Sequence, residues 1–383
     1  MRKQAGRKEK GGEMIYLKSK CGLCNRLRAI ASGIRLAQEK GDRLCVVWDR
    51  DPGMNSSYGS LFERGTDFDM VDIETVASSG LRERFRRGNE TYFDRGRCRN
   101  ELSESNLHDL FARIGDRDIF LETCDALYAD LDFSWLRPNK EVVRRMSDFK
   151  ARMAQNCIGL HIRRTDHRLA RIYSPLYLFN AAIERELDAD GETHFFLATD
   201  DEEVKHCLCA RYGSRIVTRT HVSERSDADG VLDGLVDLLL LADTKRIYGS
   251  HWSSFSAVAA QIGKIPSTRL KEQNLETAVL YHEQEIRNLN LRLRMAKAGR
   301  DGFYVVRYHK QDGSFVTVDQ LWVAGESQHV LGNEADLGWT NAGMSLKGWS
   351  ETAESKVVVH RNGAMGVDLA VPGATRHLYA VWG

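Results

Sequence analysis

The regular alternation of strand-like and helix-like segments between residues 156 and 265 most constrains how this chain can fold. Apolar runs such as CIGLHIR (157–163) and HFFLATD (194–200) alternate with helical stretches such as VLDGLVDLLLLADT (231–244) and SSFSAVAAQIG (253–263). Parallel strands need long crossover connections, so this alternation is typical of a parallel sheet covered by helices on both faces. We therefore predict an α/β lobe over residues 151–268.

A second α/β lobe is predicted over residues 14–150. The segment from Met14 to Asp49 has the pattern of a strand, a turn, a helix and a strand. Its apolar residues Leu27, Ile30, Ala31, Ile34 and Ala37 recur at helical spacing, and the pattern stops at Gly41. Residues 1–13 are basic and polar, so we expect a disordered tail there. Two such lobes predict a bilobed α/β fold with a cleft.

The chain changes character after Pro266. Between residues 269 and 300 we predict an amphipathic helix whose stripe follows a heptad pattern: Leu275, Val279, His282, Ile286, Leu289, Leu293 and Ala296. This stripe either packs on the preceding lobe or forms a homodimeric coiled coil. Short strand-like runs then predict a small β-sandwich over residues 301–383. Its tryptophans 322, 339, 349 and 382 are expected in the core, whereas exposed tryptophans would indicate sugar binding.

Composition excludes several classes of protein. The 383 residues carry 55 Lys and Arg against 54 Asp and Glu, a net charge of +1, so bulk charge indicates no nucleic-acid partner. No apolar run is long enough to span a membrane, and the polar N-terminus does not resemble a signal peptide. Eight cysteines in so long a chain favour reduced thiols. We expect a cytoplasmic protein, either free or peripheral to a membrane.

The strand CIGL ends in a cluster of polar residues, His161, Arg163, Arg164 and Asp166. Ligands of parallel sheets bind at the carboxyl ends of the strands. The planar, permanently charged guanidinium of arginine suits a diphosphate, although a surface Arg–Asp pair is the simpler interpretation.

Two further segments carry polar groups at expected strand ends. Asp200 and Asp201 could accept hydrogen bonds from a ribose or a base, or cap the following helix. Asp233 and Asp237 lie on the next helix, and Ser253 and Ser254 follow the strand RIYGS, where hydroxyl and N–H groups could hold a phosphate.

The first lobe offers the segment GLCNRLR (22–28) at its first strand-to-helix turn. Gly22 permits close approach of a ligand, and Asn25 can cap the helix or bind a sugar oxygen. The spacing is not that of a dinucleotide site, and Cys21 and Cys24 lack the partners of a zinc site. Asp49-Arg50-Asp51 is a D-x-D triplet, which in another class of transferase binds a metal and a nucleotide diphosphate.

Together these segments resemble the inverting fucosyltransferases of the GT-B fold, a group that includes alpha-1,6-fucosyltransferases. The resemblance covers roughly residues 14–265 and rests on GLCNRLRA (22–29), HIRRTD (161–166), FFLATDD (195–201) and the block from DLLLLAD to GSHWSSFS (237–256). It implies two Rossmann-like lobes, a GDP-fucose donor held mostly by the second lobe, a glycan acceptor at the first, and no metal or cofactor.

The resemblance also assigns roles to individual residues. Arg163 matches the arginine that contacts the donor β-phosphate, and His161 matches a nucleotide-contacting position. Asp237, or alternatively Asp233, matches the carboxylate that binds guanine. The remaining expected donor-binding residues are Gly22, Arg26, Arg164, Asp200, Asp201, Ser253 and Ser254, and Asn25 joins Arg163 and Asp166 as an expected catalytic residue.

The chain departs from the family where alpha-1,6 enzymes carry a glutamate soon after this motif, because HRLARIYS follows here. The acceptor base is therefore either Asp166 or an oxygen of the donor phosphate, and the alpha-1,6 linkage does not carry over. Two other functions stay open. One is a metal-dependent transferase that uses the D-x-D triplet, and the other is a non-catalytic sugar-binding protein that works through the β module.

Overall fold

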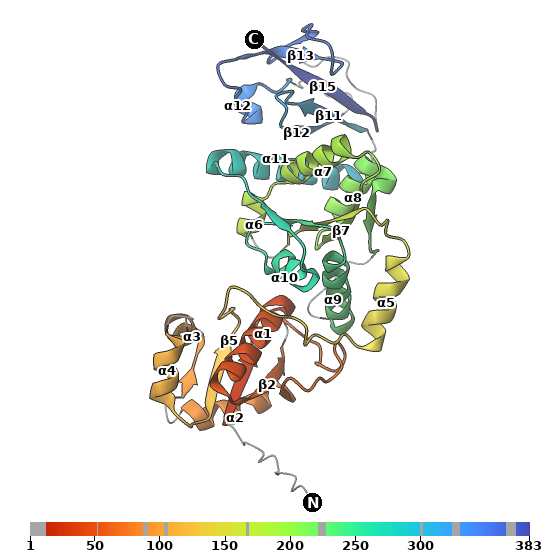
Figure 1. Ribbon diagram of the computed structural model, residues 1–383. Helices are drawn as coiled ribbons and strands as arrows, with labels where there is room; N and C mark the ends of the chain where they lie inside the picture. The colour runs from red at the N-terminus through yellow and green to blue at the C-terminus, as the bar shows by residue number, and fades with distance from the viewer. Residues whose placement is uncertain are drawn as a thin grey trace, which may run out of the picture. The chain divides into compact units, whose positions relative to one another are not determined.

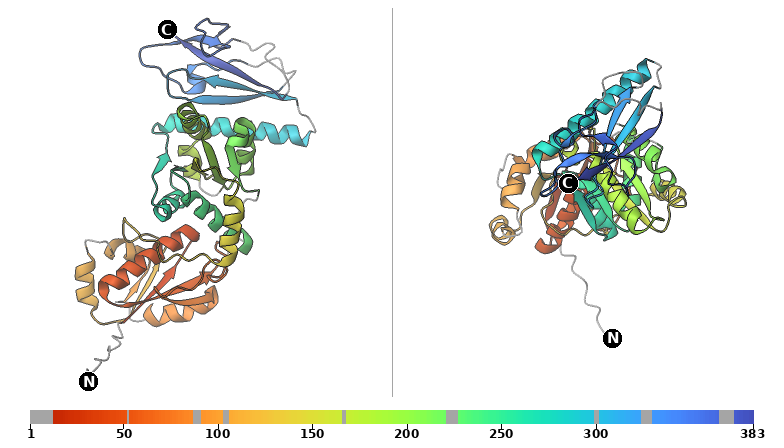
Figure 2. Two further views of the ribbon diagram at one scale, coloured as in Figure 1. Left: turned by 45° about the vertical axis from the view of Figure 1, so that its right-hand side comes forward. Right: turned by 90° about the horizontal axis from the view of Figure 1, so that it is seen from above.

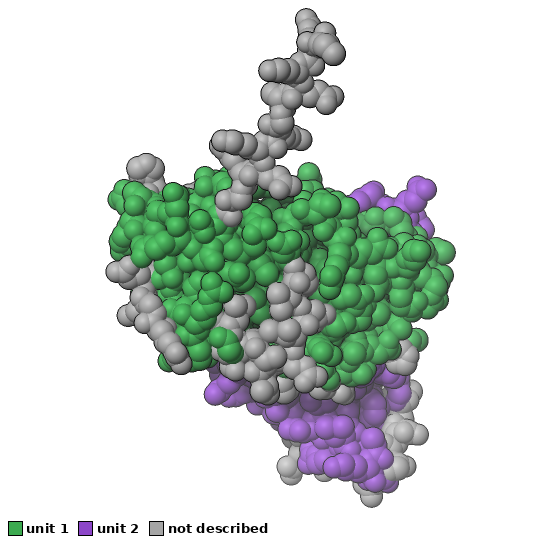
Figure 3. Space-filling view, turned by 90° about the horizontal axis from the view of Figure 1, so that it is seen from below, with its two compact units in different colours: residues 1–153, 219–244, 254–266 green, residues 154–218, 245–253, 267–383 purple. Residues whose placement is uncertain are grey.

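The computed structural model describes residues 13–51, 53–86, 91–102, 106–165, 168–220, 227–298, 302–323, 330–364 and 373–383 (Figure 1). The tail expected over residues 1–13 therefore lies outside the described residues, apart from Glu13. Contacts group the chain into two compact units, coloured in Figure 3. Unit 1 comprises residues 1–153, 219–244 and 254–266, and unit 2 comprises residues 154–218, 245–253 and 267–383.

Unit 1 contains a five-stranded parallel sheet. Its elements are β1 (Met14–Ser19), α1 (Leu23–Lys40), β2 (Arg43–Arg50), β3 (Asp69–Glu74), α2 (Thr75–Arg86), β4 (Tyr92–Phe93), α3 (Arg95–Glu101), α4 (Leu107–Ile114), β5 (Ile119–Thr123), α5 (Lys140–Lys150), α9 (Ala228–Ala242) and α10 (Ser254–Gly263). The strand order is β3-β2-β1-β5-β4. Strand β5 is buried along its whole length, as expected for a sheet covered on both faces. Helix α1 ends as predicted at Gly41, which adopts φ +77°.

Helices α9 and α10 pack against each other in unit 1, α9 also against α5 and α10 also against α1. Helix α9 buries ten residues, all apolar except Asp233, and Asp227 caps its first turn by accepting from the Gly230 N–H. Gly263 allows the two helices to approach closely, because a Cβ atom there would lie 2.0 Å from the Ala242 carbonyl oxygen. The close approach of the two helices therefore requires glycine at position 263.

Unit 2 contains the second parallel sheet. Its elements are β6 (Cys157–Ile162), α6 (Arg168–Tyr173), α7 (Leu176–Ala189), β7 (His194–Thr199), α8 (Glu202–Tyr212), β8 (Ile216–Thr218), β9 (Ile247–Ser250), β10 (Ser267–Leu270), α11 (Leu275–Lys297), β11 (Phe303–His309), β12 (Thr317–Val323), α12 (Glu334–Leu337), β13 (Leu346–Ser350), β14 (His360–Arg361) and β15 (Thr375–Trp382). The strand order is β10-β9-β6-β7-β8, that of a Rossmann-like sheet. The prediction of two Rossmann-like α/β lobes is confirmed.

The C-terminal β module forms one five-stranded mixed sheet in the described residues, not the two facing sheets of a sandwich. Its order is β12-β11-β15-β13-β14, with β11 and β15 parallel and the other pairs antiparallel. One core joins this sheet to residues of α7, α11 and α12. The rings of Tyr177 and Tyr281 lie 4.2 Å apart, and the Tyr281 hydroxyl donates to the Leu337 carbonyl at 2.7 Å. Helices therefore supply the layer for which we expected a second sheet.

The module's tryptophans are mostly core residues, as predicted. Trp322, Trp339 and Trp349 are buried, and the half-buried Trp382 donates to the Lys310 carbonyl. Sugar binding through exposed tryptophans of this module therefore loses its structural basis. The strand expected at VDLAV (367–371) lies outside the described residues.

Helix α11 is present as predicted, and His282, Ile286 and Leu289 of its heptad stripe line a cavity of unit 2 together with residues of α6, α7 and α8. The side chains of α11 that are buried in unit 2 are Ala278, Tyr281 and Met295. Each lies one residue before a member of the stripe. Figure 2 shows the helix running along the sheet of the β module. The inward face also carries Glu285, Asn288 and Arg292, which make polar contacts with other elements of unit 2. Leu275, Val279 and Leu293, toward the two ends of the stripe, do not line that cavity and are exposed.

None of the described helices is both long enough and apolar enough to cross a membrane.

Candidate functional site

Residues 161–165 of the predicted motif lie at the point where the strand order of the second sheet reverses. The chain adds β7 and β8 on one side of β6 and then β9 and β10 on the other, so the reversal point lies at the carboxyl ends of β6 and β9, where such sheets bind ligands. His161 is buried near the end of β6, and Arg163 follows it half-exposed. The Arg163 N–H donates to the Ser250 hydroxyl, at the end of β9, at 3.1 Å. Both motifs therefore meet at the position where such sheets bind ligands.

Asp200 holds the loop that carries these arginines. Its carboxylate accepts from the backbone N–H groups of Arg164 at 2.7 Å and Thr165 at 3.3 Å, and from the Thr165 hydroxyl at 2.7 Å. Strand β7 delivers the carboxylate because it pairs with β6 in register. The geometry gives Asp200 a positioning role that we did not predict.

The neighbouring Asp201 caps helix α8, accepting from the Val204 N–H at 3.1 Å. This is the capping interpretation that the sequence left open beside ligand binding. The expected catalytic Asp166 lies outside the described residues.

Arg164 points into the body of unit 2. Its guanidinium is buried, donates to the Arg171 carbonyl at 3.3 Å, and lies 3.5 Å from the Glu285 carboxylate on α11. Burial raises the pKa of Glu285, and the charge of Arg164 opposes that rise. The side chain thus ties the motif to α11, which corrects our expectation of a donor contact.

The loop after β9 is held by Ser174. The Ser174 hydroxyl donates to the Leu270 carbonyl at 2.6 Å and accepts from the His251 N–H at 2.8 Å. Burial lowers the pKa of His251, and Lys271 and Arg269 add to the effect. Trp252 follows with 58% of its surface exposed and a left-handed φ of +61°. A bulky residue rarely adopts that conformation, so the backbone of this loop is strained at Trp252, close to the carboxyl end of β9.

Ser253 and Ser254, the serines expected to bind phosphate, lie at the start of α10. Ser253 is buried, and Ser254 is the first residue of the helix. In unit 1 the Ser254 hydroxyl lies 3.4 Å from the Asn25 side-chain oxygen. That oxygen also accepts from Arg28 at 2.7 Å, and Gly22, not Asn25, is the N-cap residue of α1. The structure therefore brings Gly22, Asn25 and Ser254 together in one unit.

Arg26 is fully buried, in contrast to the expected donor contact. Its guanidinium donates to the carbonyls of Cys21 at 2.8 Å and Asp49 at 2.6 Å, and to the Asp51 carboxylate at 2.9 Å. Desolvation lowers its pKa, while Asp51 and Asp49 oppose the shift. Arg26 therefore fixes the first turn to the end of β2.

The carboxylates of the D-x-D triplet are both ion-paired. Asp49 is buried 2.7 Å from the Lys18 ammonium, and Asp51 is bound by Arg26. Within the part of the chain that the structure describes, no group of three or more metal-ligating side chains occurs. A cation at this triplet would have to displace both basic partners.

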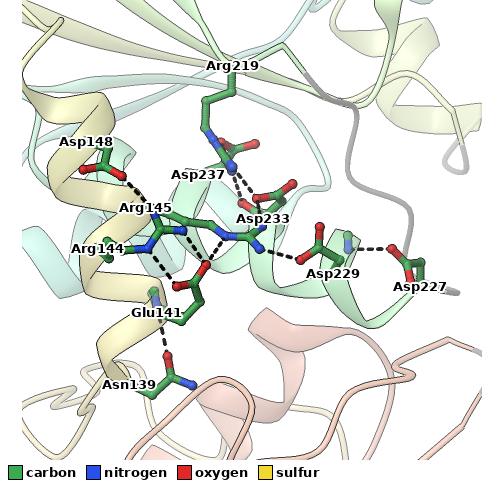
Figure 4. Close-up of polar contacts among 12 residues, drawn as sticks. Asn139, Glu141, Arg144, Arg145, Asp148, Arg219, Asp227, Asp229, Asp233 and Asp237 are labelled. Atoms are coloured by element: carbon green, nitrogen blue, oxygen red, sulfur yellow. Dashed lines mark hydrogen bonds and ion pairs between the residues drawn. The ribbon is translucent and has the colours of Figure 1, made fainter.

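Asp233 and Asp237 belong to an ionic network between α5 and α9, drawn in Figure 4. Asp233 is buried, lies 2.9 Å from Arg145 and is also bound by Arg219, while Asp237 lies 3.3 Å from Arg219. Two arginines thus neutralise Asp233, and the half-buried Asp237 shares one of them. Both carboxylates considered for guanine therefore have an arginine partner. Neither Arg145 nor Arg219 stood out in the sequence.

A cavity of about 660 Å³ lies within unit 2, lined by residues of α6, α7, α8, α11 and the module's sheet. Its charged side chains pair with one another, as in Arg292 with Glu203 at 3.2 Å and Arg307 with Asp319 at 2.8 Å. These pairs join α11 to α8 and β11 to β12. The cavity is also lined by Arg164, which follows β6, and by apolar residues of α11 such as Ile286 and Leu289.

No protein family and no curated protein matches the chain in sequence. Solved structures with a similar fold include NodZ alpha-1,6-fucosyltransferase soaked with GDP-fucose, at 18% identity and a TM-score of 0.48, which covers 66% of this chain and 92% of that one. NodZ from Bradyrhizobium, at 18% identity and a TM-score of 0.46, covers 65% and 92%. Apo POFUT1, at 11% identity and a TM-score of 0.43, covers 70% and 99%.

Proposed function

We propose that this chain is an inverting glycosyltransferase that transfers fucose from GDP-fucose to a glycan acceptor without a metal ion. The observation that carries the proposal is the hydrogen bond between the Arg163 N–H and the Ser250 hydroxyl, because it joins the ends of β6 and β9 at the reversal point of a Rossmann-like sheet.

Arg163 has the chemistry that departure of GDP requires. Negative charge grows on the β-phosphate as the bond to fucose breaks, and a fixed guanidinium stabilises that charge more in the transition state than in the ground state. Ser250 and Asp200 hold the backbone on both sides of this residue. Its side chain can therefore act without reorganising its loop.

The start of α1 in unit 1, taken by itself, also offers groups that could bind a phosphorylated sugar. Gly22 leaves the start of α1 without a side chain, and Asn25 and Ser254 present polar groups beside it. These groups suit the pyrophosphate and the sugar. The acceptor hydroxyl would be deprotonated by Asp166 or by the departing phosphate.

The first experiment compares Arg163→Ala with Arg168→Ala, an exposed arginine on α6, by measuring GDP release from GDP-fucose with a glycan panel. We expect Arg163→Ala to lose at least about 100-fold in kcat, in line with loss of one transition-state donor, and Arg168→Ala to stay near wild type. Circular dichroism confirms that both variants fold. Near-normal turnover by Arg163→Ala would refute the proposal.

Nucleotide specificity and metal independence are tested separately. GDP should raise the melting temperature, whereas UDP and CDP should not, because only guanine matches the Asp237 carboxylate. Activity should survive EDTA. Loss of activity in EDTA, restored by Mn²⁺, would favour the D-x-D alternative instead.

A further inference from the structure

Helix α11 exposes an apolar stripe along one face. Leu275, Val279, Ile286, Leu289 and Leu293 retain between 36% and 54% of their surface exposed. His282, in the middle of the stripe, is half-buried, and Ile286 and Leu289 are partly exposed while also lining the cavity of unit 2. Soluble proteins rarely expose contiguous apolar faces of this kind without an interaction partner.

The stripe has the spacing of a coiled-coil seam, with successive steps of four and three residues. Val279, Ile286 and Leu293 occupy the a positions, and Leu275, His282, Leu289 and Ala296 occupy the d positions. Of the two flanking edges, the one that contains Glu285 and Arg292 faces unit 2 itself, where both form ion pairs. Only the other edge, with Glu276, Glu283, Asn290 and Lys297, is exposed.

The exposed edge is complementary to itself in the antiparallel direction. When Ile286 is placed against the partner's Leu289, Glu276 comes beside the partner's Lys297 and Glu283 beside the partner's Asn290. His282 then faces the partner's Leu293. A parallel pair would set His282 against itself and bring Arg292 alongside the partner's Lys297, two like charges.

We infer that α11 is a homodimerisation surface on which a second copy of this chain docks its own α11 in antiparallel orientation. A two-fold axis between Ile286 and Leu289 makes every contact occur twice, as an isologous interface requires. A single pair of helices of this length buries an area near the low end for specific interfaces, about 1,200 Å². The dimer is therefore reversible, with a dissociation constant in about the micromolar range.

Sedimentation velocity of the full chain tests the association. We expect a species of twice the 43.4 kDa chain mass to grow between about 1 and 100 μM protein. Leu289→Asp should weaken the dimer by at least about 100-fold, because it buries an unpaired charge at the centre of the seam. Leu289 is 36% exposed, so the monomer should still fold.

The matched control is Leu169→Asp on α6, a comparably exposed leucine that lies off the stripe. It should leave association unchanged. A wild-type chain that stays monomeric at about 100 μM, or a Leu169→Asp variant that dissociates as fully as Leu289→Asp, would overturn the inference.

A charge swap tests the orientation. Glu276→Lys should weaken the dimer several-fold, because the substituted side chain of each copy then meets the like charge of the partner's Lys297. Adding Lys297→Glu should restore the dimer, because opposite charges face each other again. In a parallel pair these two positions do not meet, so failure of the second change to rescue the first would exclude the antiparallel arrangement.

Discussion

Substitution of Asp200 tests whether this carboxylate organises the arginine loop. Its three hydrogen bonds hold both backbone and side-chain groups of residues 164 and 165. Hydrogen bonds to a charged group contribute about 1.5 to 3 kcal/mol each, but Asp200 is half-exposed and one of its contacts is long. We therefore assign about 3 kcal/mol of stabilisation to the three hydrogen bonds of Asp200 together. Asp200→Asn removes the charge and sets an amide NH₂ against N–H donors, so most of that stabilisation should be lost.

The expected result is a loss of about 100-fold in kcat/KM for GDP-fucose, since about 2.7 kcal/mol of loop organisation must then be supplied during turnover. The melting temperature should fall by a few degrees. Amide hydrogen exchange without nucleotide should show faster exchange at Arg164 and Thr165, which separates positioning from a direct donor contact.

Asp201→Asn is the matched control, because it removes the same charge one residue away. Asparagine caps a helix about as well as aspartate, so the bond from the Val204 N–H should persist and activity should stay within about twofold of wild type. If Asp200→Asn keeps near-normal activity and exchange rates, or if the two variants behave alike, the positioning role is refuted.

Three further substitutions probe other parts of the chain. Trp252→Gly should relieve the left-handed backbone at this exposed position, raising stability by up to about 1 kcal/mol in thermal denaturation while lowering transfer activity; unchanged stability would show that the loop is unstrained. Gly263→Ala should destabilise unit 1 by about 2 kcal/mol or more in urea titration, because its Cβ would meet the Ala242 carbonyl, and a wild-type midpoint would contradict the packing. Burial lowers the pKa of His309 to about 3 in the folded protein. As the pH drops from about 6.5 towards 3, the imidazole is protonated in the unfolded chain but not in the folded protein, so the free energy of unfolding falls. Urea unfolding followed by tryptophan fluorescence should show a loss of roughly 1 to 2 kcal/mol between about pH 7 and pH 5 that His309→Asn reduces; equal losses in both proteins would refute this.

The heptad pattern of α11 and the hydrogen bonds of Asp200 differ in how far the sequence could predict them. The heptad spacing of α11 depends only on residues close in sequence, so the sequence predicts it. The sequence could not predict which residues of the stripe pack on the lobe and which are exposed. The orientation of the helix depends on polar partners in distant strands. One of them is Asp319 of β12, whose backbone carbonyl accepts a hydrogen bond from the Asn288 side chain at 2.8 Å. The inward face of the helix therefore combines buried residues such as Tyr281 with polar residues such as Asn288 that find partners on distant elements.

By itself the sequence determined the two α/β sheets, the ends of α1, the position of α11 and the segments that meet at the carboxyl ends of β6 and β9, because periodicity, glycine and strand-end polarity are properties of neighbouring residues. Only the tertiary structure decided that Arg26, Arg164 and Asp233 are held by internal ion pairs, that Asp200 supports the arginine loop, and that helices close the β module. Those outcomes depend on which charged groups of distant segments come within hydrogen-bond distance, and no local pattern encodes that distance.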